Sequence, residues 1–167
     1  MRTQIIARLS AVKGTRRQLA TEPLSQVALA AWKDFLRAHS RLTRELDDEL
    51  RQRHGFGLGD YDVLAQLAEV PNGRLRMFEL ASTVVLSPSG LSRRIDRLER
   101  SGLVTRERAE RDARNIEARL TPAGKRLLGK LRATHRAGVK QRFADRYSAR
   151  ELESLGELLA RLNDPQG

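Results

Sequence analysis

The sequence predicts a mainly α-helical fold with one small β-hairpin, and three patterns carry this prediction. Apolar residues recur at every third or fourth position over most of the chain, which is the spacing of amphipathic helices. Residues 115–120 instead alternate apolar with polar side chains, as half-buried strands do. Pro88 and Pro122 each follow a hydroxyl residue, and this arrangement is typical of helix starts.

Composition narrows the class of protein. The length of 167 residues suggests one domain, or one domain plus an extension. Because the chain has no cysteine, disulfides and thiolate metal sites are excluded, and we expect a reducing cytoplasm. The net charge of +11 favours a polyanionic partner over an ordinary solvated basic surface, although charge alone does not separate DNA, RNA and an acidic membrane. No apolar run reaches the length of a membrane span, so no membrane partner is expected.

The first 23 residues differ in character from the segment that follows. Residues 1–23 are basic and lack a long apolar stretch, so we expect a disordered tail rather than a secretory signal. Over residues 25–54 a stripe of side chains steps by three and four positions, which predicts one long helix. Such a helix does not bury its apolar side alone, so it packs on another element or another chain. The stripe consists of Leu29, Trp32, Leu36, His39, Thr43, Leu46 and Leu50.

Three short helices are expected next, over residues 60–70, 77–84 and 88–101. A Pro-Asn-Gly turn at residues 71–73 separates the first two. Ser87 is expected to cap the third helix, which ends at the glycine that follows it.

Two strands and two further helices complete the chain. Residues 104–109 and 115–120 are expected to form a hairpin around a short charged loop. Helices are expected from residue 122 to about 147 and from 149 to 163. Short helix, turn, helix and hairpin in this order are the parts of a winged helix-turn-helix. The long flanking helices keep unburied apolar stripes, and a second copy of the chain is the simplest way to cover them.

The helix over residues 88–101 has two different faces when its residues are placed at 100° steps. Leu91, Ile95 and Leu98 share the face expected to be buried. Arg93 lies on the opposite face, where its guanidinium has the geometry to bind a guanine edge in the major groove. The alternative is a solvated amphipathic helix with no DNA role. The residues of this helix that we expect to contact DNA are Ser87, Ser89, Gly90, Ser92, Arg93, Arg94 and Arg97.

The hairpin is expected to act as a wing that enters the minor groove. Its DNA-contacting residues are expected to be Arg108, Arg111, Asp112 and Arg114, at or near the tip. Asp112 is placed to hold Arg114 in one geometry, and the alternative is an ordinary surface ion pair that contributes little.

The stretch from Asp60 to Gly124 resembles the MarR family of bacterial regulators. The motifs that carry the resemblance stand in order at the family's spacing: Tyr61-Asp62-Val63-Leu64, Glu79-Leu80-Ala81, the run from Leu86 to Glu99, Ser101-Gly102-Leu103-Val104, Asp112-Ala113-Arg114 and Leu120-Thr121-Pro122-Ala123-Gly124. One departure is Ala113, where the family often has a second arginine.

The resemblance implies a homodimer that reads a pseudo-palindromic site in double-stranded DNA. Many members are repressors that small phenolic or lipophilic ligands release. The implied organisation is a tail at 1–23, an N-terminal dimerisation helix at 24–56, a DNA-binding lobe at 57–121 and C-terminal dimerisation helices at 122–163.

The remaining expectations concern an effector, metals and catalysis. In the family the effector pocket lies where the first long helix meets the DNA-binding lobe, which points to Trp32, Phe35, His39 and Tyr61, with core or dimer-interface packing as the alternative. The three histidines have no metal-site spacing and no catalytic residue order is present, so we expect no metal, no cofactor and no enzyme activity. We expect a repressor in the cytoplasm, associated with the nucleoid. The competing hypothesis is a non-specific architectural DNA-binding protein without an effector.

Overall fold

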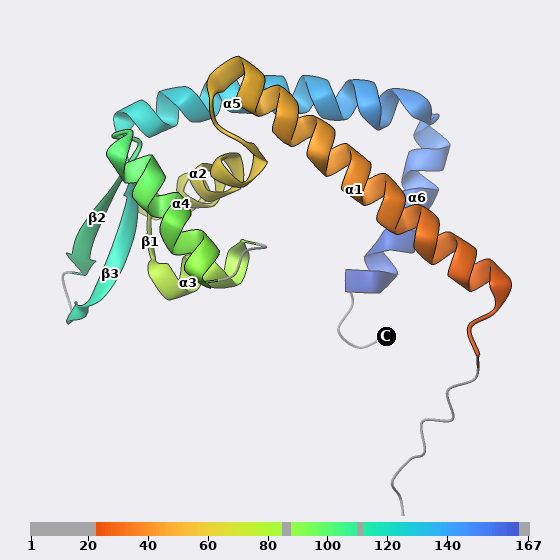
Figure 1. Cartoon of the computed structure of the whole chain (residues 1–167), viewed down its shortest axis with the longest axis horizontal. Helices are drawn as coiled ribbons and strands as arrows, with labels where there is room; N and C mark the ends of the chain where they lie inside the picture. The colour runs from red at the N-terminus through yellow and green to blue at the C-terminus, as the bar shows by residue number, and fades with distance from the viewer. Residues whose placement is uncertain (1–22, 85–87, 110–111, 164–167) are drawn as a thin grey trace, which may run out of the picture. The chain divides into compact units, whose positions relative to one another are not determined.

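The structure is a computed structural model that describes residues 23–84, 88–109 and 112–163 (Figure 1). The predicted tail therefore lies, except for Pro23, outside the described residues. The chain divides into two compact units, Met1–Arg37 and Ala38–Gly167, and each is described by itself.

The predicted long helix is confirmed as α1 (Gln26–His54), which starts in the first unit and continues into the second. Ser25 begins it, because the Ser25 hydroxyl accepts the backbone N–H of Ala28 at 3.1 Å. In the first unit, Trp32 and Phe35 stack on each other with ring centroids 5.9 Å apart. The helix ends where Gly55 adopts a φ of 75°, a left-handed conformation that favours glycine.

The second unit contains the predicted order of short helices, hairpin and two final helices. The hairpin's second strand begins three residues earlier than expected, and the long helix after it ends about five residues earlier, before a short 3₁₀ turn. The elements are α2 (Leu58–Glu69), η2 (Pro71–Gly73), β1 (Arg74–Arg76), α3 (Met77–Thr83), α4 (Pro88–Arg100), β2 (Val104–Ala109), β3 (Asp112–Leu120), α5 (Pro122–Arg142), η3 (Ala144–Arg146) and α6 (Ala149–Asn163).

The sheet has three antiparallel strands in the order β1-β3-β2. Sequence analysis missed β1, which pairs with the base of β3 through Leu75 and Ala118. In the hairpin, Val104 pairs with Leu120, and the register shifts between Arg108 and Ala109. The short β1 strand fixes the base of the wing to the helical part of the lobe.

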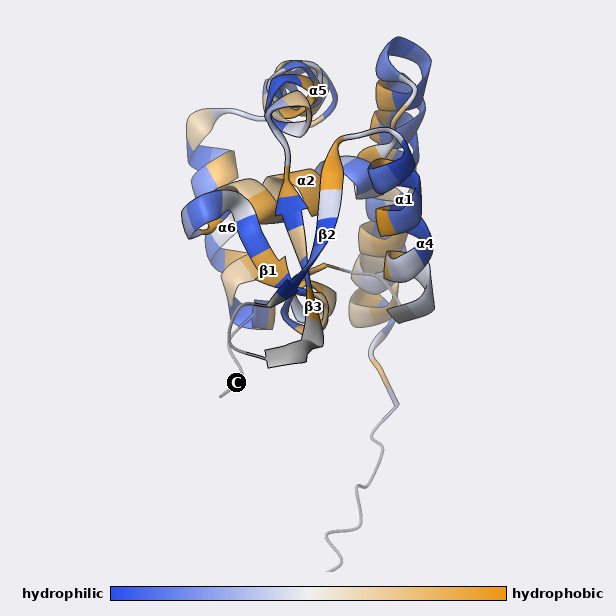
Figure 2. Cartoon of the chain, turned by 90° about the vertical axis from the view of Figure 1, so that its left-hand side faces the viewer, coloured by the Kyte–Doolittle hydropathy of each residue, from blue (hydrophilic) through white to orange (hydrophobic). Residues whose placement is uncertain are grey.

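One hydrophobic core joins the helices to the sheet, and α2 at its centre is largely hydrophobic (Figure 2). Leu91, Ile95 and Leu98 of α4 are at most 1% exposed, so the predicted buried face is confirmed. At the start of α5, a side chain at Gly124 would clash with the Leu103 backbone carbonyl. This glycine lets α5 lie directly against the loop that joins α4 to β2.

The final helix, α6, keeps apolar side chains exposed when the chain is taken alone. Leu158 is 55% exposed and Leu162 is 72% exposed, in line with the unburied apolar stripe expected of the flanking helices. No residue of α6 is buried. In the part of the chain that the structure describes, no helix has both the length and the apolar character that crossing a membrane requires.

Candidate nucleic-acid interface

The N-terminal half of α4 presents a small polar face to solvent. Ser89, Ser92 and Arg93 are all exposed, whereas Leu91 between them is buried. The Arg93 Nε makes a long hydrogen bond of 3.4 Å to the Ser89 carbonyl oxygen. Within the described ranges no carboxylate pairs with Arg93, so its guanidinium is available to an external anion or base edge.

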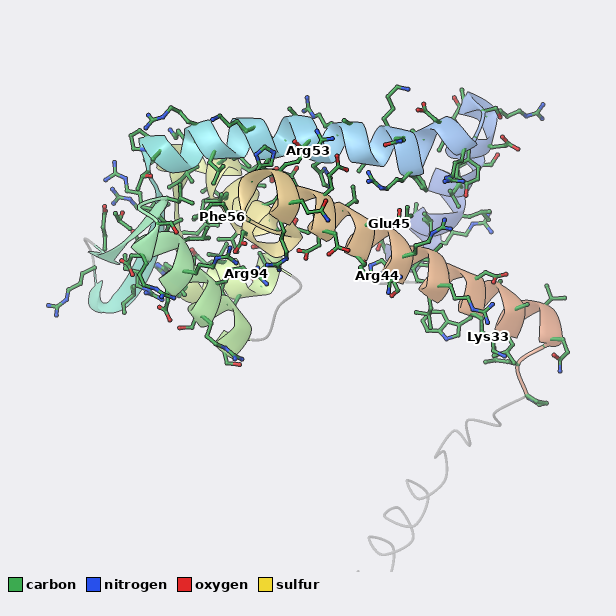
Figure 3. All side chains as sticks on the ribbon, turned by 45° about the horizontal axis from the view of Figure 1, so that its top comes forward. Lys33, Arg44, Glu45, Arg53, Phe56 and Arg94 are labelled. Carbon is green, nitrogen blue, oxygen red and sulfur yellow. The ribbon has the colours of Figure 1, made fainter. Side chains whose placement is uncertain are left out.

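A buried carboxylate connects α4 to the start of α2. Asp60 is 0% exposed, and its Oδ2 accepts the backbone N–H of Gly57 at 2.9 Å. Its Oδ1 lies 3.2 Å from Nη1 of Arg94, which points from α4 towards α2 (Figure 3). The Asp60 Oδ2 also lies 3.4 Å from Nη1 of Arg97. One carboxylate thus caps α2 and holds two arginines of α4.

Arg94 and Arg97, which were predicted to contact DNA, thus have partners within the chain. The Arg97 guanidinium donates to the Gly55 carbonyl oxygen and lies 5.2 Å from the centre of the Phe56 ring. The Arg94 side chain is only 23% exposed. The helical wheel placed Arg97 on the outward face, but its long side chain folds back over the α1–α2 loop. These contacts hold α4 against α2, and DNA contact by Arg94 and Arg97 stays a prediction.

The pKa values of two carboxylates, Asp47 on α1 and Asp62 on α2, are shifted in opposite directions. Burial on its own raises the pKa of Asp47, but the Arg51 guanidinium and the Leu58 backbone N–H more than offset it, so the net pKa is lowered. The Leu58 N–H donates to Asp47 Oδ1 at 2.7 Å, which ties α1 to the start of α2. Burial raises the pKa of Asp62, and the positive charge of Arg94 opposes this only in part.

The wing is attached to α4 by ion pairs at its base. Arg106 on β2 pairs with Asp96 at 2.5 Å and with Glu99 at 2.7 Å. The Arg106 backbone N–H also donates to Glu99 at 3.0 Å, and its guanidinium donates to the Ser92 carbonyl oxygen at 3.3 Å. Burial on its own lowers the pKa of Arg106, but the hydrogen bonds and charges of Asp96 and Glu99 outweigh it. The net pKa of Arg106 is therefore raised, and this cation stays charged. The wing and α4 are therefore held in a fixed orientation.

The structure describes only part of the predicted wing contacts. Arg108 is exposed on β2. Asp112 and Arg114 belong to β3, but their side chains lie outside the described part of the structure, so the orienting role of Asp112 stays a prediction. Arg111 lies outside the described residues, as does Ser87 at the other end of the interface. Gly90 is half-buried beside Arg93.

The four residues predicted to line an effector pocket fall into two groups. Trp32 and Phe35 belong to the first unit, and both are exposed in the single chain. His39 and Tyr61 belong to the second unit. The Tyr61 ring stacks on His135 with centroids 4.6 Å apart, a partner that sequence analysis missed. The effector pocket therefore stays a prediction.

Histidines in the second unit make structural contacts. The His54 Nε2 lies 2.8 Å from the Thr134 hydroxyl, which joins the end of α1 to α5. Burial lowers the pKa of His135. Among the residues that the structure describes, no group of three or more histidine, aspartate or glutamate side chains is arranged to hold a metal ion.

Comparison with known proteins places the chain in a family. Residues 54–115 match the MarR family. The chain is also similar to AbsC of Streptomyces coelicolor, a MarR family transcriptional regulator, with 34% identity and a TM-score of 0.77 over 86% of this chain and 96% of that one. The chain belongs to the MarR family of transcriptional regulators. The predicted winged helix-turn-helix with flanking long helices is thereby confirmed.

The chain is also similar to two further transcriptional regulators. Sco3205 of Streptomyces coelicolor, a MarR family regulator solved in complex with DNA, is 33% identical, with a TM-score of 0.78 over 84% of this chain and 89% of that one. YkoM of Bacillus subtilis strain 168, an uncharacterised HTH-type transcriptional regulator, is 26% identical over 117 residues, which is 70% of this chain and 74% of that protein. The chain thus shares its fold with a regulator that has been solved in complex with DNA.

Proposed function

We propose that this MarR-family regulator binds a pseudo-palindromic operator in double-stranded DNA as a homodimer and represses nearby genes. The observation that carries the proposal is the solvent-facing polar end of α4, where Arg93 stands exposed beside Ser89 and Ser92. The ion pairs of Arg106 hold the wing at a fixed angle to this end. Sco3205, which shares the fold, was solved with DNA.

The homodimer part of the proposal is supported by apolar side chains that the single chain leaves in water. Leu158 and Leu162 on α6 are exposed, and so are Trp32, Phe35 and Leu36 on the first part of α1. Exposed groups of large apolar side chains often mark interfaces between proteins, and a second copy of the chain would bury these. Two copies of α4 would then meet two half-sites of one operator.

Release by a small phenolic or lipophilic ligand is the third part of the proposal, and it rests on family membership. The Tyr61–His135 stack lies between α2 and α5, so a ligand that displaced it would shift α2. A shift of α2 would move Asp60 and with it the two arginines of α4. This gives the proposal a physical route from effector to DNA surface.

The test is selection of bound duplexes from a randomised DNA library, followed by titration of the selected duplex and a scrambled one at the same salt concentration. A sequence-specific regulator prefers its site by at least about a thousandfold. Recovery of a two-fold symmetric motif supports the dimeric operator. A ratio near one would instead favour the alternative, a non-specific architectural DNA-binding protein without an effector.

A further inference from the structure

The helix α5 carries an unusual charge distribution. Between Pro122 and Arg142 it has seven lysines and arginines and no acidic residue. Two of the seven are neutralised by neighbours: Arg142 pairs with Glu49 at 2.7 Å, and Lys140 pairs with Asp145 at 2.6 Å. In the part of the chain that the structure describes, no carboxylate pairs with the other five. Four of these five are exposed, namely Lys125, Arg126, Lys130 and Arg136.

These four cations lie on the side of α5 that faces away from the core. Placed at 100° steps, they fall within about 140° of one another, opposite the buried Leu128 and Leu131. The exposed positions beside them carry small residues. A Cβ added at Gly129 would have no neighbour within 4 Å, and Ala133 and Ala137 continue the row. We call the exposed side of α5 from Lys125 to Arg136 the α5 basic face.

The α5 basic face is separate from the surface proposed to read the operator. The start of α5 adjoins the C-terminal end of α4, because the Thr121 hydroxyl donates to the Gly102 carbonyl oxygen at 2.8 Å. Ser89 lies at the N-terminal end of α4, about 17 Å along the helix axis from Arg100 at its C-terminal end. Figure 2 shows α5 end-on, lying over α2. The outward side of α5 is therefore turned away from the hydrophobic core, against which α4 also packs.

The chemistry of the face fits phosphates better than it fits a protein. Stable protein interfaces depend on buried aromatic and large apolar anchors. The α5 basic face has cations, glycine and alanine at its exposed positions and no large apolar side chain. Phosphate contacts need cations and close approach of the backbone, both of which this row provides. Lys125 and Arg136 are about 17 Å apart along α5, so the row is long enough to contact phosphates on both sides of a groove about 12 Å wide.

We propose that the α5 basic face binds the phosphate backbone of a second DNA duplex, so that a regulator bound to its operator bridges two DNA segments. The inference rests on the proposed operator binding by α4 and the wing. Contact through the α5 basic face is independent of sequence, because it involves no base edges. Its strength falls steeply with salt, by up to about 3.6 in the slope of log K against log salt if all four cations contact phosphates.

The experiment is a two-step capture assay. The duplex selected for the proposed function is fixed to beads and saturated with protein, and the amount of retained protein is measured first. A labelled duplex of scrambled sequence is then added, and its retention is followed across a salt series. The test variant carries Lys125→Gln, Arg126→Gln, Lys130→Gln and Arg136→Gln. The control carries Arg41→Gln, Arg44→Gln, Arg53→Gln and Arg146→Gln, and so has the same net charge. These are four exposed cations outside α5, and none is adjacent in sequence to the apolar side chains proposed to form the dimer.

We expect the wild type and the control to retain the second duplex, and the α5 variant to retain at least tenfold less of it. All three proteins should stay bound to the fixed duplex. Equal retention by the α5 variant, or no retention by the wild type, would overturn the inference and leave operator binding intact. Failure of the first step would instead refute the proposed function. A polyglutamate peptide that binds the wild type through α5, without capture of DNA, would identify an acidic protein as the partner and also overturn it.

Discussion

The ion cluster around Asp60 gives the sharpest prediction about how the recognition helix is held. Replacing Asp60 with alanine removes the anion from two arginines whose side chains are 23% and 39% exposed, and also removes the cap on the Gly57 N–H. Breaking a fully buried pair costs roughly 3–5 kcal/mol, and loss of a cap costs about 1 kcal/mol. Because water reaches both arginines, we expect a total of about 3 kcal/mol in the free energy of unfolding.

The assay is urea unfolding at one protein concentration, with Asp60→Asn as the variant that keeps the shape of the side chain and loses its charge. We expect Asp60→Asn to lower the free energy of unfolding by about 2 kcal/mol. A double-mutant cycle with Arg94→Gln should give a coupling energy of about 1 kcal/mol or more. A loss below about 0.5 kcal/mol for Asp60→Asn, with no coupling to Arg94, would refute the view that charge pairing fixes α4 to α2.

Three further predictions concern the dimer, pH and the wing. Leu158→Asp should sediment as a folded monomer at micromolar concentration, because the new charge cannot be buried against a partner. The control Glu157→Gln, at the neighbouring exposed position, should stay dimeric, and a dimeric Leu158→Asp protein would contradict the proposed interface. Because burial lowers the pKa of His135, the free energy of unfolding should decrease as the pH falls through its ordinary value of 6.5 towards the lower folded pKa, and His135→Phe should reduce this dependence; unchanged slopes would show that His135 does not cause it. Arg114→Ala should flatten the slope of log K against log salt by roughly one unit per half-site, and Asp112→Ala should weaken DNA binding if Asp112 orients Arg114; tighter binding by Asp112→Ala would reduce the pair to a surface ion pair.

Local patterns in the sequence were sufficient to predict most of the helices and one of their faces. The apolar spacing of Leu91, Ile95 and Leu98 predicted the buried side of α4. Thr121 before Pro122 predicted the start of α5, and the structure shows the Thr121 hydroxyl accepting the Gly124 N–H at 3.0 Å. These features depend on residues within one turn of each other, so a single sequence contains the information.

Long-range contacts were the part that the sequence did not reveal. The β1 strand is only three residues long, carries two arginines, and exists because it pairs with β3 about 43 positions later. The pairing of Arg94 with Asp60 spans 34 positions, so no helical spacing predicts it. The only local signal was the Gly57–Asp60 cap, which marks Asp60 as a helix start but not as an ion-pair partner. For this reason the helical spacing gave the outward angle of Arg97 but not its contacts with Asp60 and Gly55.

The central claim is that Arg93, at the exposed end of α4, reads DNA sequence. The direct measurement is the affinity of wild type and Arg93→Ala for the selected duplex and for its scrambled version, at one salt concentration. We predict that Arg93→Ala weakens binding to the selected duplex by roughly 1–3 kcal/mol and leaves binding to the scrambled duplex nearly unchanged, so that the specificity ratio falls. An equal loss on both duplexes would contradict the account, because Arg93 would then contact only phosphate.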